Sequence, residues 1–313
     1  MTNWKNTLLI SETDFNNLRS NNCNIEVNTD GIEIAPNEGV IVQCETSGNQ
    51  ILAVYNSKSK SVELLKDIAS SPNKDLALLH HYISDESIEA VVVDGFPGVG
   101  KTSSIMKYAL NNLKVPATAG AVNDSRTYHP DGSRKSSLFK GTIEKIYITR
   151  PDATIGTGHG FLPGDLREKL TPLFGSFIQY VDRFHPLGFE KLHELGCIEM
   201  APLTYIQGRD LDNSIIIADE FQNCDDEVAI MFLTRPTDNS RTFILGDTTK
   251  FQIANKKNSS SKNGLEIAHE YLRGAHWYSR VEMRTLNHIL RGKMVRKIVS
   301  TWLSKVNSDN KEE

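Results

Sequence analysis

Residues 95–102 read Gly-Phe-Pro-Gly-Val-Gly-Lys-Thr, and this stretch decides the fold of the 313-residue chain. It directly follows an apolar run at residues 90–93 and precedes residues 103–113, whose composition suits a helix. Glycines let the backbone N–H groups of such a loop wrap a triphosphate, and the following helix dipole points its positive end at the same phosphates. A glycine-rich turn that binds nothing would leave the spacing and the flanking elements unexplained. The stretch therefore predicts a strand, a phosphate-binding loop (P-loop) and a helix.

Individual residues of this loop have expected roles. Lys101 is expected to face the β- and γ-phosphates of a nucleotide, and Thr102 is expected to ligate Mg²⁺. The residues expected to bind the nucleotide are Gly95, Phe96, Pro97, Gly98, Val99, Gly100, Lys101, Thr102 and Ser103.

The composition is that of an ordinary globular protein, with 39% hydrophobic and 24% charged residues. No apolar run approaches the length needed to cross a bilayer, and the first residues lack the apolar centre of a secretory signal. We therefore expect a cytoplasmic protein without a membrane partner. Cys23, Cys44, Cys197 and Cys224 lack the spacing of a disulfide frame or a zinc site, so they are expected to be thiols.

The formal net charge of −4 argues against a surface that holds nucleic acid by its overall positive field. Two local basic clusters could still contact phosphates, although either could be an ordinary solvated face. The first contains Lys256, Lys257 and Lys262, and the second contains Arg291, Lys293, Arg296, Lys297 and Lys305.

The chain is expected to have three parts. Residues 1–70 are expected to form a small β-rich module, because residues 38–66 alternate short β-rich runs with turn residues typical of antiparallel hairpins. Residues 71–304 are expected to form a P-loop ATPase domain that contains a surface insertion at residues 118–141. Residues 305–313 are a polar tail with little reason to be ordered.

Buried strands alternate with helices from residue 88 onward, which indicates an α/β fold with a mostly parallel sheet covered on both faces. Strands are expected at residues 88–93, 143–149, 198–201, 214–218 and 242–245. Helices are expected at residues 75–82, 102–113, 167–184, 225–233 and 265–272.

Acidic side chains follow two of these strands. Asp219 and Glu220 end the apolar run at residues 215–218, where Asp219 is expected to hold Mg²⁺ and Glu220 to act as the catalytic base. Asp247 and Thr248 end the next strand, where ligands gather in such sheets, and either could sense the γ-phosphate or the attacking water. A turn that merely ends the strand is the alternative for this second pair.

Hydrolysis also needs positive charge on the transferred phosphate, which an arginine from the same chain or from a neighbouring subunit can supply. The candidates are Arg150, Arg209, Arg235 and Arg291. Each of them, judged alone, could equally form a surface ion pair.

Several segments resemble, in order, the motifs of PhoH-type ATPases, and together with the P-loop they span roughly residues 88–300. They are Thr149-Arg150-Pro151, Gly160-Phe161-Leu162-Pro163-Gly164-Asp165-Leu166, Glu168-Lys169, Gly208-Arg209, Asp219-Glu220-Phe221-Gln222-Asn223 and Phe232-Leu233-Thr234-Arg235. The stretch at residues 38–65 also resembles the small module that precedes the ATPase in PIN-PhoH fusions.

The resemblance implies a RecA-like core related to superfamily 1 helicases, Mg²⁺-dependent ATP hydrolysis, a ring-like homo-oligomer such as a hexamer and, in some members, RNA-directed activity. Matched residue by residue, it supports roles for Lys101, Thr102, Asp219, Glu220, Arg209 and Arg235. It also places Arg291 on the family's C-terminal arginine. Gln222 falls on the family glutamine after the acidic pair, which places it among the nucleotide-binding residues, and there it could couple the phosphate state to a bound strand.

The chain departs from the family pattern at three places. Lys250 stands where the family usually has a glutamine, with Gln252 two residues later, so sensing of the γ-phosphate is expected to be rearranged. The glutamine often found ahead of the P-loop is missing from the helix expected at residues 75–82, which weakens the preference for adenine. The insertion at residues 118–141 is additional material.

Two functional hypotheses remain open at this point. The first is a nucleic-acid-stimulated ATPase or helicase-like motor that acts on single-stranded RNA or DNA. The alternative is an ATP-gated switch or assembly factor that binds a protein partner without nucleic-acid stimulation. A small-molecule kinase would share the P-loop but should also have an arginine-rich lid and a substrate pocket, neither of which is evident.

Overall fold

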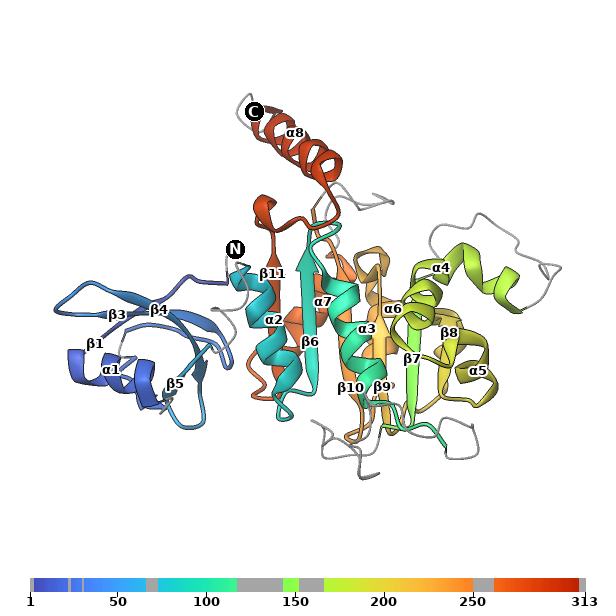
Figure 1. Ribbon diagram of the computed structural model, residues 1–313, viewed down its shortest axis with the longest axis horizontal. Coiled ribbons are helices and arrows are strands. Elements are labelled where there is room, and N and C mark those ends of the chain that lie inside the picture. Colours follow the sequence, from blue (N-terminus) through green and yellow to red (C-terminus); the bar gives the residue numbers. More distant parts are fainter. Residues whose placement is uncertain are drawn as a thin grey trace.

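The computed structural model describes residues 3–21, 24–29, 31–65, 73–116, 143–151, 166–249 and 262–309. These residues form two β-sheets, a five-stranded sheet near the N-terminus and a six-stranded sheet that carries the P-loop (Figure 1). The insertion expected at residues 118–141, the Gly160–Asp165 portion of the family motif, Lys250, Gln252, Lys256 and Lys257 all lie outside the described residues.

The N-terminal module contains the five-stranded sheet, with strand order β1-β3-β4-β5-β2. Its elements are β1 (Thr7–Ile10), α1 (Glu12–Asn21), β2 (Ile25–Glu26), β3 (Gly39–Cys44), β4 (Gln50–Asn56) and β5 (Ser61–Leu64). The hairpins between β3, β4 and β5 are antiparallel as expected, but β1 pairs parallel with β3, so the sheet is mixed. Helix α1 closes a separate small core, with Leu18 against Val40 and Val42.

The six-stranded sheet is parallel throughout, with strand order β11-β6-β10-β9-β7-β8. Its strands are β6 (Ala90–Gly95), β7 (Lys145–Arg150), β8 (Ile198–Pro202), β9 (Ser214–Ala218), β10 (Arg241–Gly246) and β11 (Tyr278–Met283). Strand β10 therefore separates the P-loop strand β6 from β9, which leads into the two acids. This arrangement confirms the expected RecA-like P-loop fold.

Helices cover both faces of this sheet, because successive strand residues point to opposite sides. Val91 and Val93 of β6 join the core under α2 (Lys74–Ser84), α3 (Lys101–Asn112), α4 (Leu166–Phe184) and α5 (Gly188–Glu194). Ala90 and Val92 join the second core, under α6 (Asp226–Leu233) and α7 (Gly264–Leu272). Short 3-10 turns η3 (Leu203–Ile206), η4 (Phe221–Asn223) and η5 (Leu286–His288) lie in the connections.

Side-chain caps fix the starts of three of these helices, among them α6, where the Asp225 side chain accepts from the Val228 N–H. The Asn73 side chain accepts hydrogen bonds from the backbone N–H groups of Asp75 and Leu76, at 3.1 and 3.0 Å, and so begins α2. Asn263 and Glu266 form a capping box at the start of α7.

Strand β11 and the end of helix α8 differ from the sequence-based expectation, and helix α5 was not expected either. Strand β11 was not expected, because its apolar residues alternate with Ser279, Arg280 and Glu282, as happens at the edge of a sheet. The last helix, α8 (Lys293–Asp309), extends past the expected end of the ATPase domain at residue 304. In Figure 1 this helix stands beyond the end of the sheet that carries the P-loop.

The N-terminal module packs beside edge strand β11 and helix α2 (Figure 1). The Asn3 side chain accepts a hydrogen bond from the Glu282 N–H, at 2.6 Å, and donates one to the Glu282 carbonyl, at 2.7 Å. Asn37 donates to the carbonyls of His276 and Tyr278, at 2.8 and 3.1 Å. Two asparagines thus satisfy backbone groups that an edge strand would otherwise expose.

Candidate nucleotide-binding site

The P-loop connects β6 to α3 and forms one wall of a cavity of about 640 Å³. Gly98 and Gly100 adopt φ angles of 81° and 99°, which favour glycine, and a Cβ at Gly98 would lie 2.6 Å from the Cβ of Arg291. The Leu290 N–H donates to the Gly98 carbonyl at 2.8 Å, so the segment after β11 lies against the loop. The glycines therefore serve both the turn and this close approach.

Lys101 is the first residue of α3 and lines the cavity, as expected from the sequence. Its ammonium group donates to the carbonyls of Gly95 and Phe96, the latter at 3.2 Å. Burial lowers the pKa of Lys101, while the nearby carboxylates of Asp247 and Asp219 act in the opposite direction. The positive charge is thus held near the loop by neutral backbone acceptors, which an anionic ligand could replace.

Asp219 and Glu220 follow β9 and lie in the same cavity as Lys101. Glu220 has a φ of 55°, a left-handed conformation that turns the chain sharply after the strand. Burial and the charge of Asp219 raise the pKa of the Glu220 carboxyl. A carboxylate with a raised pKa accepts a proton more readily, which suits a catalytic base.

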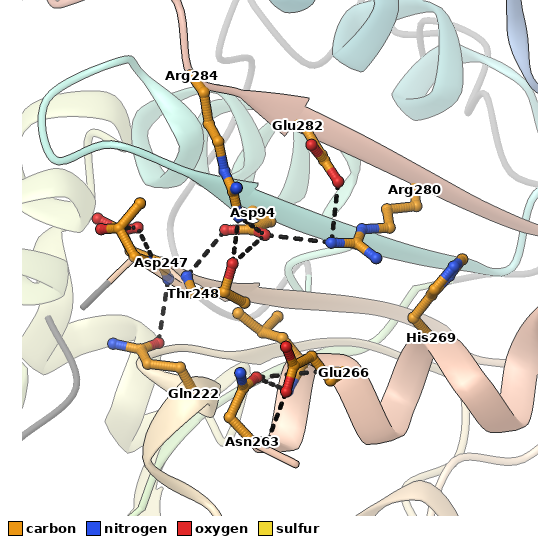
Figure 2. Close-up of polar contacts among 12 residues, drawn as sticks. Asp94, Gln222, Asp247, Thr248, Asn263, Glu266, His269, Arg280, Glu282 and Arg284 are labelled. Carbon is orange, nitrogen blue, oxygen red and sulfur yellow. Dashed lines mark hydrogen bonds and ion pairs between the residues drawn. The ribbon is translucent and has the colours of Figure 1, made fainter. Parts of the chain in front are cut away.

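Gln222 links Glu220 to the end of β10. Its amide nitrogen donates to Glu220 Oε2 at 2.7 Å, and its amide oxygen accepts from the Asp247 N–H at 3.2 Å. Figure 2 shows Gln222 reaching toward Asp247 from below. The sequence placed Gln222 among the nucleotide-binding residues, whereas its described contacts are with Glu220 and Asp247.

Asp247 lies in the cavity, and its two carboxylate oxygens differ. Oδ1 accepts from the N–H and the hydroxyl of Thr249, at 2.9 and 2.6 Å. Oδ2 is buried and has no hydrogen-bond partner among the described residues. Burial raises the pKa of this carboxyl. An unpartnered buried oxygen indicates a position for a ligand, a water or an ion.

A buried charge network that the sequence did not reveal supports this region (Figure 2). Asp94, near the end of β6, is fully buried and accepts from the N–H and hydroxyl of Thr248, at 3.0 and 2.7 Å. It also pairs with Arg284 at 2.5 Å and with Arg280 at 3.2 Å. The only sequence signal was an aspartate between the apolar run and the P-loop. The network fixes Thr248, and with it the loop that carries Asp247.

The four candidate arginines divide between the two edges of the sheet. Arg150 and Arg291 line the cavity at the carboxyl edge. Arg209 instead pairs with Glu199, at 2.5 Å, beside Lys145, the first residue of β7. Arg235 donates to the Met231 carbonyl at 3.2 Å. It lies in the connection between α6 and the start of β10. The predicted catalytic roles of Arg209 and Arg235 are therefore not supported within one chain, because the connections carry them to the amino edge.

Helix α4 supplies a wall of the cavity that the sequence did not identify. Ser176, Tyr180, Arg183 and Phe184 line this side. The rings of Tyr180 and Phe184 stack with their centroids 5.7 Å apart, and the Arg183 guanidinium lies 5.7 Å from the Phe184 ring centroid.

The residues present fit a magnesium nucleotide. The P-loop backbone and Lys101 line an open cavity, and Thr102 and the buried Asp219 line it as well. Within the described ranges, no group of three His, Cys, Asp or Glu side chains could hold a metal ion by itself. Mg²⁺ usually takes one or two protein carboxylates together with substrate phosphates, so Thr102 and Asp219 would hold it only alongside a nucleotide.

Comparison with known proteins gives a family match. The sequence model of the family described as PhoH-like protein matches residues 133–302, more than half of the chain. The match begins after the P-loop, whose assignment rests on its own sequence and geometry.

Similar curated proteins agree with this match. A PhoH-like protein of Bacillus subtilis is 35% identical over 187 residues, covering 58% of this chain and 56% of the relative. Protein PhoH of Escherichia coli is 28% identical over 238 residues, covering 70% and 65% respectively. The chain thus spans a little over half the length of the first of these relatives.

A solved structure described as "The structure of PRRSV helicase" covers 83% of this chain and 44% of its own, with 10% identity and a TM-score of 0.28. A likeness this weak carries no weight for function. Among the described helices, none is both long enough and apolar enough to span a bilayer.

Proposed function

The chain belongs to the family of PhoH-like proteins, and from this premise we propose that it hydrolyses ATP and that single-stranded nucleic acid stimulates the hydrolysis. One observation carries the proposal: Lys101 of the P-loop, the acids Asp219 and Glu220, and Asp247, which follows the intervening strand β10, line a single cavity. Hydrolysis of a nucleotide needs a phosphate cradle, a metal site and a base in one place.

Each of these residues has a proposed role. The P-loop N–H groups and Lys101 bind the phosphates, and Thr102 and Asp219 hold Mg²⁺, which would neutralise phosphate charge when bound. Glu220 accepts the proton of the attacking water, and the hydrogen bond from Gln222 holds the Glu220 carboxylate in position. Asp247 orients that water or senses the terminal phosphate through its unpartnered oxygen.

The nucleic-acid part of the proposal is supported by the second basic cluster. Arg291, Lys293, Arg296 and Lys297 are exposed on the segment that lies against the P-loop and on the first turns of α8. Exposed cations beside a nucleotide site would let a polyanion influence the loop. We also propose that the chain assembles into a ring, in which Arg209 and Arg235 would act on the nucleotide of a neighbouring copy.

A second candidate is the ATP-gated switch that binds a protein partner. The observation in its favour is a set of exposed apolar side chains on the same segment, Leu290 at 67%, Met294 at 77% and Ile298 at 45% exposure. Large exposed apolar residues close together often mark a protein interface.

The test is the rate of ATP hydrolysis with Mg²⁺, measured at low salt with single-stranded RNA, single-stranded DNA, duplex or no nucleic acid. We expect turnover that requires Mg²⁺ and rises with a single strand, and Lys101→Ala should abolish tight nucleotide binding. Replacing Lys293 and Lys297 by Glu should reduce the stimulation while leaving the basal rate unchanged. Nucleotide-dependent capture of a partner, with no response to any strand, would favour the switch, and phosphate transfer to another acceptor would indicate a kinase.

A further inference from the structure

Arg150 is the one candidate arginine that contacts the catalytic acids in the part of the chain that the structure describes. It ends β7, next to β9, and the Asp219 N–H donates to the neighbouring Thr149 carbonyl at 2.9 Å. Its Nε and Nη2 atoms donate to Asp219 Oδ2, at 3.0 and 2.5 Å. Nη2 also lies 3.9 Å from Glu220 Oε1.

The rest of the guanidinium is held by helix α4. Nη1 donates to the Leu173 carbonyl at 2.6 Å, and the group lies 5.4 Å from the centroid of the Phe177 ring. The side chains of Arg150 and Asp219 are 23% and 8% exposed. The ion pair is therefore positioned by fixed elements and only partly screened by water.

The pair engages an oxygen of the residue that is proposed to hold Mg²⁺. A divalent cation bound to Asp219 would compete with the guanidinium for the same carboxylate. A buried charge that loses its partner is costly, so the guanidinium needs another anion once it leaves Asp219. Because Arg150 lines the same cavity as Lys101, a terminal phosphate bound there is such an anion.

We propose that Arg150 exchanges partners during nucleotide binding: it neutralises Asp219 before the metal binds, and contacts the terminal phosphate of the nucleotide in its own chain afterwards. The exchange rests on the proposed function. It keeps both Arg150 and Asp219 paired with an opposite charge in either arrangement, and it makes productive nucleotide binding depend on the metal. Arg150 would thus be the arginine supplied in cis.

The first test measures affinity for a fluorescent, non-hydrolysable ATP analogue in EDTA and in Mg²⁺. Asp219→Asn removes the charge that holds Arg150 but keeps the shape of the side chain. In EDTA we expect this variant to bind the analogue about tenfold more tightly than the unmodified chain, a gain typical of coupled charges. In Mg²⁺ its affinity should fall, because a metal ligand is lost.

The second test asks whether Arg150 causes that gain. Adding Arg150→Gln to Asp219→Asn should remove the gain in EDTA. Arg150→Gln alone should lower the Mg²⁺ concentration for half-maximal analogue binding several-fold, and should reduce turnover by about a thousandfold because the phosphate contact is lost. Arg183→Gln is the matched control, since Arg183 lines the same cavity but contacts no carboxylate among the described residues. It should leave the Mg²⁺ midpoint unchanged.

The exchange is overturned if Asp219→Asn binds the analogue no more tightly in EDTA, or if its gain persists without Arg150. An unchanged Mg²⁺ midpoint in Arg150→Gln would also overturn it. The Asp219→Asn variant keeps Arg150 and its contact with α4. Its analogue affinity in EDTA therefore remains a test even if Arg150→Gln does not fold. Failure of the unmodified chain to bind any nucleotide would instead overturn the proposed function.

Discussion

The two edges of the parallel sheet hold cations in different ways. At the amino edge, Arg241 of β10 is completely buried and donates to the carbonyls of Tyr82, Ile83, Asp85 and Ile88 and to the Tyr108 hydroxyl. At the carboxyl edge, Lys101 and Arg150 have partners that line a cavity.

The difference separates structural charges from functional ones. The acceptors of Arg241 are mostly backbone groups of the segment around the end of α2, so only unfolding of that segment would release the guanidinium. The partners of Lys101 and Arg150 face space that a ligand can enter, so a phosphate or a metal ion can take their place. We therefore expect the cations that line the cavity to serve ligand binding, and Arg241 to serve stability.

The largest expected effect removes the chemistry of the carboxyl edge without changing its shape. Glu220→Gln should lower ATP turnover by about a thousandfold and retain nucleotide affinity, because only the proton acceptor is lost. Single-turnover rates and analogue binding measure the two quantities, and the exposed Glu45→Gln of the N-terminal module is the control. Normal turnover in Glu220→Gln would remove Glu220 from the base role.

At the amino edge, a substitution is expected to lower stability and to leave nucleotide binding unchanged. Arg241→Met should lower the free energy of unfolding by about 3 kcal/mol, because several buried carbonyls lose their donor. Folded Arg241→Met should bind nucleotide as the unmodified chain does. Urea unfolding measures the loss, with the exposed Arg19→Met on α1 as the control. Weakened nucleotide affinity with unchanged stability would contradict the division between the two edges.

The sequence could predict the features of the site that depend on local spacing. The P-loop and the Asp219-Glu220 pair each lie within a few residues of a strand end, so short apolar runs were enough to place them. The arginines could not be sorted in this way. Arg150 and Arg209 each follow a strand, but the chain after β8 returns to the amino edge before Arg209, and only the tertiary structure shows that path.

Other misses have similar physical causes. Asp94 directly follows an apolar run, and the sequence does not reveal its role because its partners Arg280 and Arg284 are far away in the chain. Strand β11 alternates apolar and polar residues because Arg280 and Glu282 lie on the same face of the sheet as Asp94, where Arg280 pairs with both carboxylates. The β-rich composition indicated hairpins correctly but held no sign that β1 pairs parallel with β3.

A smaller effect is expected on the pH dependence of stability, through His269, which lies near Arg280. Burial, followed by the charges of Arg280, Arg273 and Lys5, lowers the pKa of His269 from 6.5 to about 4. Between these values the unfolded chain binds a proton that the folded chain does not, so stability falls as the pH drops from 6.5 toward 4. Since His269 is partly exposed, we expect its share of the loss to be about 1 kcal/mol.

His269→Gln should reduce the difference between the unfolding free energies measured at pH 7.5 and pH 5. Glutamine keeps a polar group near the Tyr278 hydroxyl, which lies 2.9 Å from His269 Nδ1. An identical pH dependence in both proteins would show that His269 is protonated as easily in the folded chain as in the unfolded one.

The smallest expected effect is that of Arg209→Gln, at the amino edge. The hydrogen bond from Arg209, and the nearby Lys145, lower the pKa of Glu199 to about 2. Because the Arg209 side chain is 38% exposed, losing the pair should cost less than about 1 kcal/mol of unfolding free energy. Nucleotide affinity should not change, because Arg209 does not line the cavity of its own chain.

Arg209 could still act on the nucleotide of a neighbouring copy. The turnover of Arg209→Gln distinguishes this role from that of an ion pair within its own chain. If turnover of Arg209→Gln falls, mixing it with Lys101→Ala should restore part of the rate, since mixed assemblies place an intact arginine beside an intact P-loop. Co-assembly of the two variants is verified by mass. A fall in turnover without recovery, in verified mixed assemblies, would exclude action across subunits. Unchanged turnover would instead make Arg209 a surface ion pair that serves only the amino edge.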